Sequence, residues 1–275
     1  MRSLSLFLLG TVLAVQPVSA QDAPQQGDVV VHGATKEETK KLVEALTPSR
    51  YGLQLARWND QICPEVIGLD DAHRDYVARR IKEEAQSLRV ELRKSATCTS
   101  NIVIIFTDTA DALSADVIKN YPGLIRDTDK FGLPHAADRA PYLASRPVRW
   151  FWVTGTRMVG NILSRIAKTT VENTRLSLII VDNTKLGGLK WSQLAAYIAM
   201  VALSHPDMDT DYSNNDTILS LFQRRESAEP APMSLTDQDQ VFLKALYNSN
   251  PNLEADQQRN QIFRALRNPA PKSGG

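Results

Sequence analysis

The stretch Ser177–Tyr247 decides the fold. Its main segments are SLIIVDNTKLGG (177–188), WSQLAAYIAMVAL (191–203), HPDMDTDYSNND (205–216), TILSLF (217–222) and LTDQDQVFLKALY (235–247). Residues 178–181 are continuously apolar, as in a buried strand. Residues 191–203 form a helical pattern with almost no polar side chain, and a helix that is apolar on all sides is buried. We therefore expect a strand, a core helix, an acidic turn and a second helix that packs back.

Two further apolar segments predict strands beside this unit. Residues 102–106 are all apolar, which suits a strand covered on both faces. The segment RPVRWFWVTGTR (146–157) places Trp150 and Trp152 on one face and Arg149 and Phe151 on the other, because side chains alternate along a strand. Large residues on both faces favour a core strand, and the alternative is an edge strand to which an extended peptide adds.

The remaining segments predict the elements that surround these strands. Short strands are expected at 29–32 and 51–58, and helices at 35–46, 71–93, 109–121 and 253–267. The longest helix begins after Asp70 as its cap and carries an apolar stripe that ends at Leu92.

Two segments are less regular. Residues 126–147 contain three prolines and predict a long loop or a loop with a short helical turn. Residues 158–175 fit a helix or a hairpin. The fold class that follows is α/β (α+β): a single domain over 29–268, with a mixed twisted sheet of about four to five strands and flanking helices.

The first 20 residues have the pattern of a secretory signal. Arg2 supplies the positive charge, residues 4–15 are apolar, and Val18-Ser19-Ala20 is a small-residue cleavage site. Because the apolar run is too short to span a bilayer and no cysteine follows the cleavage site, neither a membrane span nor a lipid anchor is expected. A polar leader (21–28), the domain and a disordered tail (269–275) would follow, in a periplasmic or secreted protein.

Cys63 and Cys98 are the two cysteines of the chain. Two cysteines in an exported protein predict one disulfide, and the alternative is two free buried thiols. The bridge would fasten the beginning of the longest helix to the strand at 102–106.

The charge balance gives no sign of a nucleic-acid partner. The chain has 32 Lys and Arg residues against 31 Asp and Glu residues, and the segment 1–20 holds one basic and no acidic residue. The mature chain is therefore neutral overall, whereas nucleic-acid binding needs a basic domain. The sequence identifies no partner, and an envelope protein or a peptide is the kind we expect.

Motifs for catalysis or cofactor binding are absent from the sequence. There is no G-x-S-x-G, no phosphate-binding glycine motif and no H-E-x-x-H. The four histidines (His32, His73, His135 and His205) are scattered; His135 is expected at the surface, and His205 as a cation at the end of the apolar helix. We therefore predict no catalytic, cofactor or metal residue.

The acidic turn is the one candidate that remains for a metal. Asp207, Asp209 and Asp211 have the spacing of the first three ligands of an EF-hand loop. That loop needs a glycine at its sixth position and a carboxylate at its twelfth, where this chain has Tyr212 and Ile218. A looser calcium turn that adds Asp216 is the alternative to a solvated turn whose side chains bind the local backbone.

Several segments together resemble a family of uncharacterised, signal-bearing secreted proteins of bacteria: ICPEVIGL, NIVIIFTD, RPVRWFWVTGTR, AAYIAMVALSHPDMDTDYSNNDTILSLF and LTDQDQVFLKALY. The resemblance covers about residues 29–248 and implies no activity. The last third is more distantly similar to zincin-type metallopeptidase domains. In that likeness Ala196, Tyr197 and Met200 stand where the two zinc histidines and the general-base glutamate would be, which implies a zincin-like layout without the peptidase site.

The function expected from these observations is binding or structure in the cell envelope, by an exported scaffold without catalysis. One alternative is an exported hydrolase that uses carboxylates such as Asp182, Asp207, Asp209 or Asp211, and it requires that at least two of them converge in a cleft. The other alternative is a peptide-binding module that uses the Trp150 strand as an open edge.

Overall fold

The structure is a computed structural model that describes residues 34–48, 54–94, 98–125, 136–158 and 170–269. All but one of these residues belong to a compact unit that begins at Thr35. The predicted signal segment (1–20), the leader (21–28), the strand at 29–32, His135 and all but the first residue of the tail lie outside the described residues.

The four strands lie in the first two thirds of the unit with helices between most of them, and helices follow β4 in the described part of the chain. In chain order they are α1 (Lys36–Leu46), β1 (Pro64–Ile67), α2 (Asp71–Ser87), β2 (Ile102–Thr107), α3 (Ala110–Asn120), α4 (Ala136–Leu143), β3 (Val148–Met158), β4 (Thr170–Asp182), α5 (Trp191–Ser204), α6 (Leu221–Glu226), α7 (Asp237–Asn248) and α8 (Ala255–Arg267).

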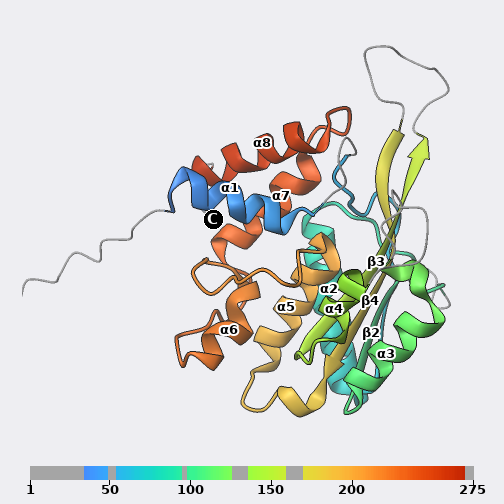
Figure 1. The fold of residues 1–275 in the computed structure, drawn as a ribbon. Helices are drawn as coiled ribbons and strands as arrows, with labels where there is room; N and C mark the ends of the chain where they lie inside the picture. The colour runs from blue at the N-terminus through green and yellow to red at the C-terminus, as the bar shows by residue number, and fades with distance from the viewer. Residues whose placement is uncertain (1–33, 49–53, 95–97, 126–135, 159–169, 270–275) are drawn as a thin grey trace, which may run out of the picture. The chain divides into compact units, whose positions relative to one another are not determined.

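The sheet has four strands in the order β1-β2-β4-β3. β1, β2 and β4 run parallel, and β3 runs antiparallel to β4 at the edge. The central strands pair Ile104 with Ile179, and both side chains are fully buried. Parallel strands need helices on both faces. Figure 1 shows α2 and α5 on one face and α3 on the other. The predicted mixed α/β sheet with flanking helices is confirmed.

The core is built around α5. Every residue from Gln193 to Ser204 is buried, so this helix is enclosed by its neighbours on all sides. A buried helix end leaves carbonyl groups that water cannot reach. Trp58 Nε1 donates to the carbonyl of Ala202 at 2.8 Å, and the Tyr247 hydroxyl donates to that of Leu203 at 2.9 Å. Two aromatic side chains from distant segments thus close the end of the core helix.

One carboxylate joins the short segment after the acidic turn to α7. Asp239 is buried and accepts hydrogen bonds from the Thr217 hydroxyl (2.5 Å) and from the backbone N–H groups of Ile218 (2.8 Å) and Thr236 (2.9 Å). Burial raises the pKa of Asp239, although these hydrogen bonds act in the opposite direction. Thr236 caps α7 and accepts from the backbone N–H of Asp239, which completes a capping box.

The predicted strand at 51–58 is wrong in its described part, residues 54–58. The segment is irregular there, with one isolated bridge between Arg57 and Asn173. Its polar side chains point inward as well as its apolar ones: Gln54 binds the carbonyl of Pro251, and Gln258 accepts from the Leu55 N–H at 2.7 Å. The segment therefore packs against the chain around α8, which the alternating pattern alone does not reveal.

The longest helix is shorter than predicted, and a strand precedes it that the sequence pattern missed. Asp70 caps α2 as expected, but the helix ends at Ser87. Arg89 has a φ of 63°, in the left-handed region, and Leu92 pairs instead with Ile62 in an isolated bridge. β1 is not among the predicted strands, because a four-residue strand that begins with proline has too few side chains to show a period.

The structure shows the form of two segments whose sequence pattern fits more than one element. Of the predicted loop at 126–147, residues 136–143 form α4. The segment at 158–175 is a hairpin in its described parts, because β3 extends to Met158 and β4 begins at Thr170. The protruding ends of these two strands are visible in Figure 1.

The predicted disulfide is confirmed, but its place in the fold differs. Cys63 and Cys98 are bonded, with their Cα atoms 6.3 Å apart. Cys63 directly precedes β1 and Cys98 comes shortly before β2, so the bond joins the starts of two paired strands. The bond was expected to fasten the beginning of the longest helix, but β1 lies between Cys63 and α2.

Removal of the disulfide should destabilise the protein without changing its fold. The bond closes a loop with a sequence separation of 35. In the chain-entropy model such a loop is worth about 4 kcal/mol of unfolding free energy. We expect a Cys63→Ser/Cys98→Ser double variant to lose about that amount of unfolding free energy in denaturant unfolding, with a larger m-value because its unfolded chain is less compact. A loss below about 1 kcal/mol would contradict this role.

Arg89 should be replaceable by glycine with a gain in stability. The residue follows the C-cap of α2, and Val90 N donates to the carbonyl of Ala85 at 2.9 Å, as in a helix end that favours glycine. We expect Arg89→Gly to raise the unfolding free energy by about 0.5–1 kcal/mol. Arg89→Ala is the matched control, because it removes the side chain but keeps the strained φ. Equal stability of the two variants would refute the strain argument.

Candidate functional site

The three positions that the zincin resemblance singles out lie inside the core. Ala196 and Met200 are fully buried, and Tyr197 is 7% exposed. The Tyr197 ring lies between Trp150 and Phe222, with centroid distances of 6.5 Å and 5.0 Å. Burial raises the pKa of the Tyr197 hydroxyl, with a smaller opposite effect from Arg146. This part of α5 therefore offers no metal ligand and no group ready to transfer a proton.

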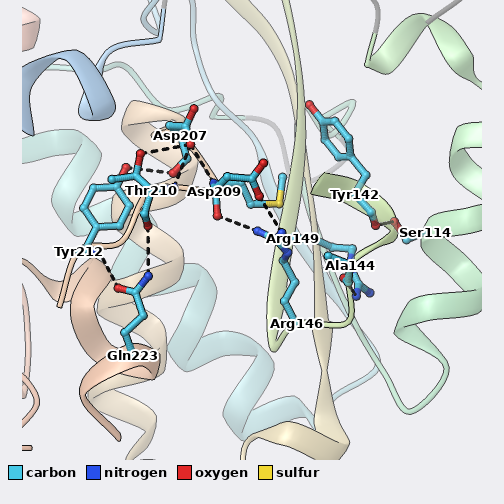
Figure 2. Close-up of polar contacts among 11 residues, drawn as sticks. Ser114, Tyr142, Ala144, Arg146, Arg149, Asp207, Asp209, Thr210, Tyr212 and Gln223 are labelled. Atoms are coloured by element: carbon cyan, nitrogen blue, oxygen red, sulfur yellow. Dashed lines mark hydrogen bonds and ion pairs between the residues drawn. The ribbon is translucent and has the colours of Figure 1, made fainter. Parts of the chain in front are cut away.

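An arginine that the sequence analysis did not single out lies next to this region. Arg146 precedes β3, and its side chain is largely covered. It donates from Nη1 to the carbonyl of Met208 at 2.6 Å and from Nη2 to Oδ1 of Asp209 at 2.8 Å. Figure 2 shows the guanidinium directed at the acidic turn. The contact joins the start of the edge strand to the turn after α5, and only the tertiary structure brings the two together.

The carboxylates of the acidic turn serve the backbone of the turn itself. Asp207 accepts from the N–H groups of Asp209 (2.8 Å) and Thr210 (3.0 Å), and Asp211 accepts from the N–H of Ser213 (2.9 Å). This last hydrogen bond is the main cause of the lowered pKa of Asp211. Such contacts are those of ordinary Asx turns.

The four candidate calcium ligands, Asp207, Asp209, Asp211 and Asp216, do not form a metal-binding group. Across the described ranges of the chain, no group of three or more His, Cys, Asp or Glu side chains is placed to hold a metal ion. The geometry therefore gives the calcium alternative no support.

Other contacts hold the turn rigidly against the rest of the unit. Gln223 accepts from the N–H of Tyr212 at 2.9 Å and donates to the carbonyl of Thr210 at 3.1 Å, as Figure 2 shows. The Tyr212 hydroxyl donates to the carbonyls of Asp207 (2.9 Å) and Ala45 (3.2 Å), the second of which belongs to α1. A turn tied in this way is part of the scaffold.

Asp182, at the end of β4, has partners of its own. It accepts from Lys185 and from the backbone and hydroxyl of Thr184. Burial alone would raise its pKa, but the hydrogen bonds from Lys185 and Thr184 bring the pKa below its ordinary value. Asp182 is therefore bound to its own loop, as Asp207 and Asp211 are bound to the acidic turn.

The face of β3 that points away from α5 carries a buried arginine, Arg149. Arg149 is fully buried and donates from Nη2 to Asp111 (2.5 Å) and to the carbonyl of Ala144 (2.9 Å). Next to it, Tyr142 of α4 stacks on Phe151 at 4.8 Å between centroids. Burial is the main cause that raises the pKa of Tyr142 to about 12, and the negative charges of Asp209 and Asp207 add to it. This tyrosine stays protonated at neutral pH.

The outer edge of β3 is free of a pairing strand within the described residues, but only part of it is accessible. Residues 148–151 are buried, and exposure begins at Trp152. A register irregularity at Val153/Thr154 interrupts the regular pairing. Bulges of this kind commonly protect sheet edges from further pairing. An edge for peptide addition is therefore limited to residues 152–158.

His205 is buried and neutral, so its predicted role as a cation at the helix end is wrong. It is 1% exposed, with a φ of 52°, and its ring stacks on Trp152 at 5.2 Å with Trp58 at 6.1 Å. Neither ring nitrogen has a hydrogen-bond partner among the described residues. Burial lowers its pKa from 6.5 to about 3. Its place between two tryptophans was not visible in the sequence.

Comparisons with protein-family models, with curated proteins and with solved structures found no match. Among the described residues, no helix combines the length and the apolar character needed to cross a membrane.

The neutral state of His205 predicts a specific acid sensitivity. Its pKa is about 3 in the folded protein and near 6.5 in the unfolded chain, so the unfolded chain binds the proton first. The stability linked to His205 is therefore complete above pH 6.5 and is lost as the pH falls, by about 1.4 kcal/mol per pH unit.

The measurement compares wild type with His205→Asn, because asparagine tolerates the left-handed φ. The readout is the slope of unfolding free energy against pH, since a smaller side chain also changes absolute stability. We expect a shallower slope for the variant between pH 6 and 4. Parallel curves would show that His205 does not take up a proton on unfolding.

Proposed function

We propose that this chain is an exported binding protein that performs no catalysis. The observation that carries the proposal is the enclosure of α5. At the positions that a zincin-type peptidase uses for chemistry, this helix has Ala196, Tyr197 and Met200, and all three side chains are core packing. A metal site there would require buried histidines and a carboxylate with an open path for substrate, and none of these is present on the helix.

The proposal also explains the polar groups near α5. Arg146 is the charged residue that acts on the Tyr197 hydroxyl. Its guanidinium binds Asp209 and the carbonyl of Met208, so its charge is used in a structural contact. An ion pair with one exposed partner stabilises the fold little, but it joins the acidic turn to the start of β3. The result is a rigid scaffold in which the acidic turn is held against the start of β3.

Export is part of the proposal. It rests on the signal-like pattern of residues 1–20 and is supported by the Cys63–Cys98 bond, because disulfides persist in oxidising compartments such as the periplasm. The envelope is the setting in which we expect such a protein to bind its ligand.

A second candidate function is strand addition at residues 152–158 of β3. It is favoured by the lack of a pairing strand on that edge within the described residues. An extended peptide would pair with the main chain there. The irregularity at Val153/Thr154 and the charge of Arg157 make this edge a poorer template than a flat apolar strand, so we rank this function second.

The test of the proposed function is metal and activity analysis of the purified mature protein. We expect no stoichiometric zinc or other transition metal, and a melting temperature that a chelator does not change, because α5 has no ligands to lose. Incubation with a denatured protein substrate should yield no cleavage products.

Two outcomes would contradict the proposal. One is a stoichiometric metal whose removal lowers the melting temperature. The other is cleavage that copurifies with the protein and is lost in Asp209→Asn but kept in the matched control Asp216→Asn. That result would make the acidic turn catalytic.

A further inference from the structure

A polar groove lies away from α5's vacant positions, where the segment 57–61 meets the end of α2 and the end of α7. Its volume is about 430 Å³, within the range of small-molecule sites. Its lining residues come from three parts of the chain: Arg57, Trp58, Asn59, Asp60, Gln61, Leu88, Arg89, Val90, Glu91, Tyr247 and Asn248. All of them are among the described residues.

Arg57 is a buried cation without an acidic partner. It is 7% exposed, and its Nη1 donates to two neutral acceptors, the carbonyl of Leu246 (2.7 Å) and the hydroxyl of Ser249 (2.6 Å). Burial lowers the pKa of the Arg57 guanidinium, because the charge has lost water. A buried charge is ordinarily matched by an opposite one, and in the described part of the chain no carboxylate lies within ion-pair distance of Arg57.

Arg89 is a second cation of the groove, and it occupies a backbone position that suits glycine. Its φ of 63° lies in the left-handed region, which disfavours a residue with a side chain. Its side chain is exposed and makes no ion pair with any described residue. The φ belongs to the end of α2, and it is the exposed guanidinium that can serve a ligand. The strain and the free guanidinium occur in the same residue, at the wall of the same groove.

The two acidic side chains of the groove already have partners. Asp60 accepts from Asn173 at 2.5 Å and pairs with Arg157 at 3.3 Å, and Glu91 accepts from Gln61 at 2.9 Å. Only Asp60 has a cationic partner, because the amide of Gln61 is neutral, so the groove keeps two guanidinium groups against the Glu91 carboxylate and is positive on balance. The acidic neighbours disfavour a ligand with several negative charges, whereas a single carboxylate suffices for Arg57 and Arg89. Apolar lining from Trp58, Leu88 and Val90 gives such a ligand an apolar surface to cover.

We propose that this groove binds a small organic molecule through one carboxylate, which Arg57 and Arg89 hold while its apolar part lies against Trp58 and Leu88. Arginine suits this task because its planar guanidinium matches a carboxylate with two parallel hydrogen bonds. The buried Arg57 supplies the fixed half of the site, and the exposed Arg89 closes on the ligand. The site is separate from α5, so the inference holds or fails independently of the metal and activity analysis.

The experiment measures the binding of two matched probes to the full mature protein by titration calorimetry. N-acetyl-leucine carries the carboxylate, and N-acetyl-leucinamide is the same molecule without the charge. We expect the acid to bind and the amide to bind at least about tenfold more weakly, because a hydrogen bond to a charged group contributes about 1.5–3 kcal/mol.

Variants of Arg89 separate recognition from folding. Arg89→Gly is expected to be more stable than wild type, so a loss of binding in it cannot come from misfolding. We expect Arg89→Gly to weaken the binding of the acid about tenfold or more and to leave the binding of the amide unchanged. Arg89→Lys keeps the charge but not the fork, so it should bind with intermediate affinity.

Three results would overturn the inference. The first is equal binding of acid and amide, which would mean that the carboxylate is not recognised. The second is unchanged affinity of the acid for Arg89→Gly. The third is no binding of either probe at millimolar concentration.

Discussion

The enclosure of α5 is the constraint on which the rest of the structure depends. A helix that is apolar on every side is stable in water only when other elements cover all of it. The sheet and α2 cover its sides, and its last carbonyls lie where water cannot reach them. Trp58 and Tyr247 supply the missing donors, so a loop before β1 and the end of α7 must both reach the same helix end. The apolar helix thus dictates the placement of segments far from it in sequence.

Because α5 is enclosed by apolar side chains, the polar contacts around it lie at the edges of the core. Arg146 and Asp209 meet where the edge strand begins, and Asp239 ties the segment after the acidic turn to α7. Arg146 and Asp209 bind each other, and the buried Asp239 accepts three hydrogen bonds, which is the usual condition for a buried carboxylate. They give the scaffold a unique arrangement, and they leave little polarity near Tyr197 for chemistry.

Several buried polar groups do not follow this pattern, and Arg146 Nε, Thr174 Oγ1 and Ser177 Oγ are among those without a partner in the described part of the chain. His205 lies between two tryptophans with neither ring nitrogen bonded among the described residues, and Arg149 has two buried nitrogens without a partner there. Arg57 is bonded, but only to neutral acceptors. Arg57 lines a groove of a size for a ligand, beside Arg89 with its left-handed φ. An unmatched buried charge next to open space is the feature that most clearly distinguishes this groove from the core.

The sequence by itself determined what depends on local pattern: the strands at 102–106 and 146–157, the core helix, the disulfide and the Asp70 cap. It could not determine β1 or the shape of residues 54–58, because a strand of four residues and a segment buried on both sides show no period. Only the tertiary structure decided that Arg146 meets Asp209, that His205 is neutral, and that Arg57 and Arg89 share a groove. These contacts join residues distant in sequence, and burial and charge pairing act through space, so no local pattern encodes them.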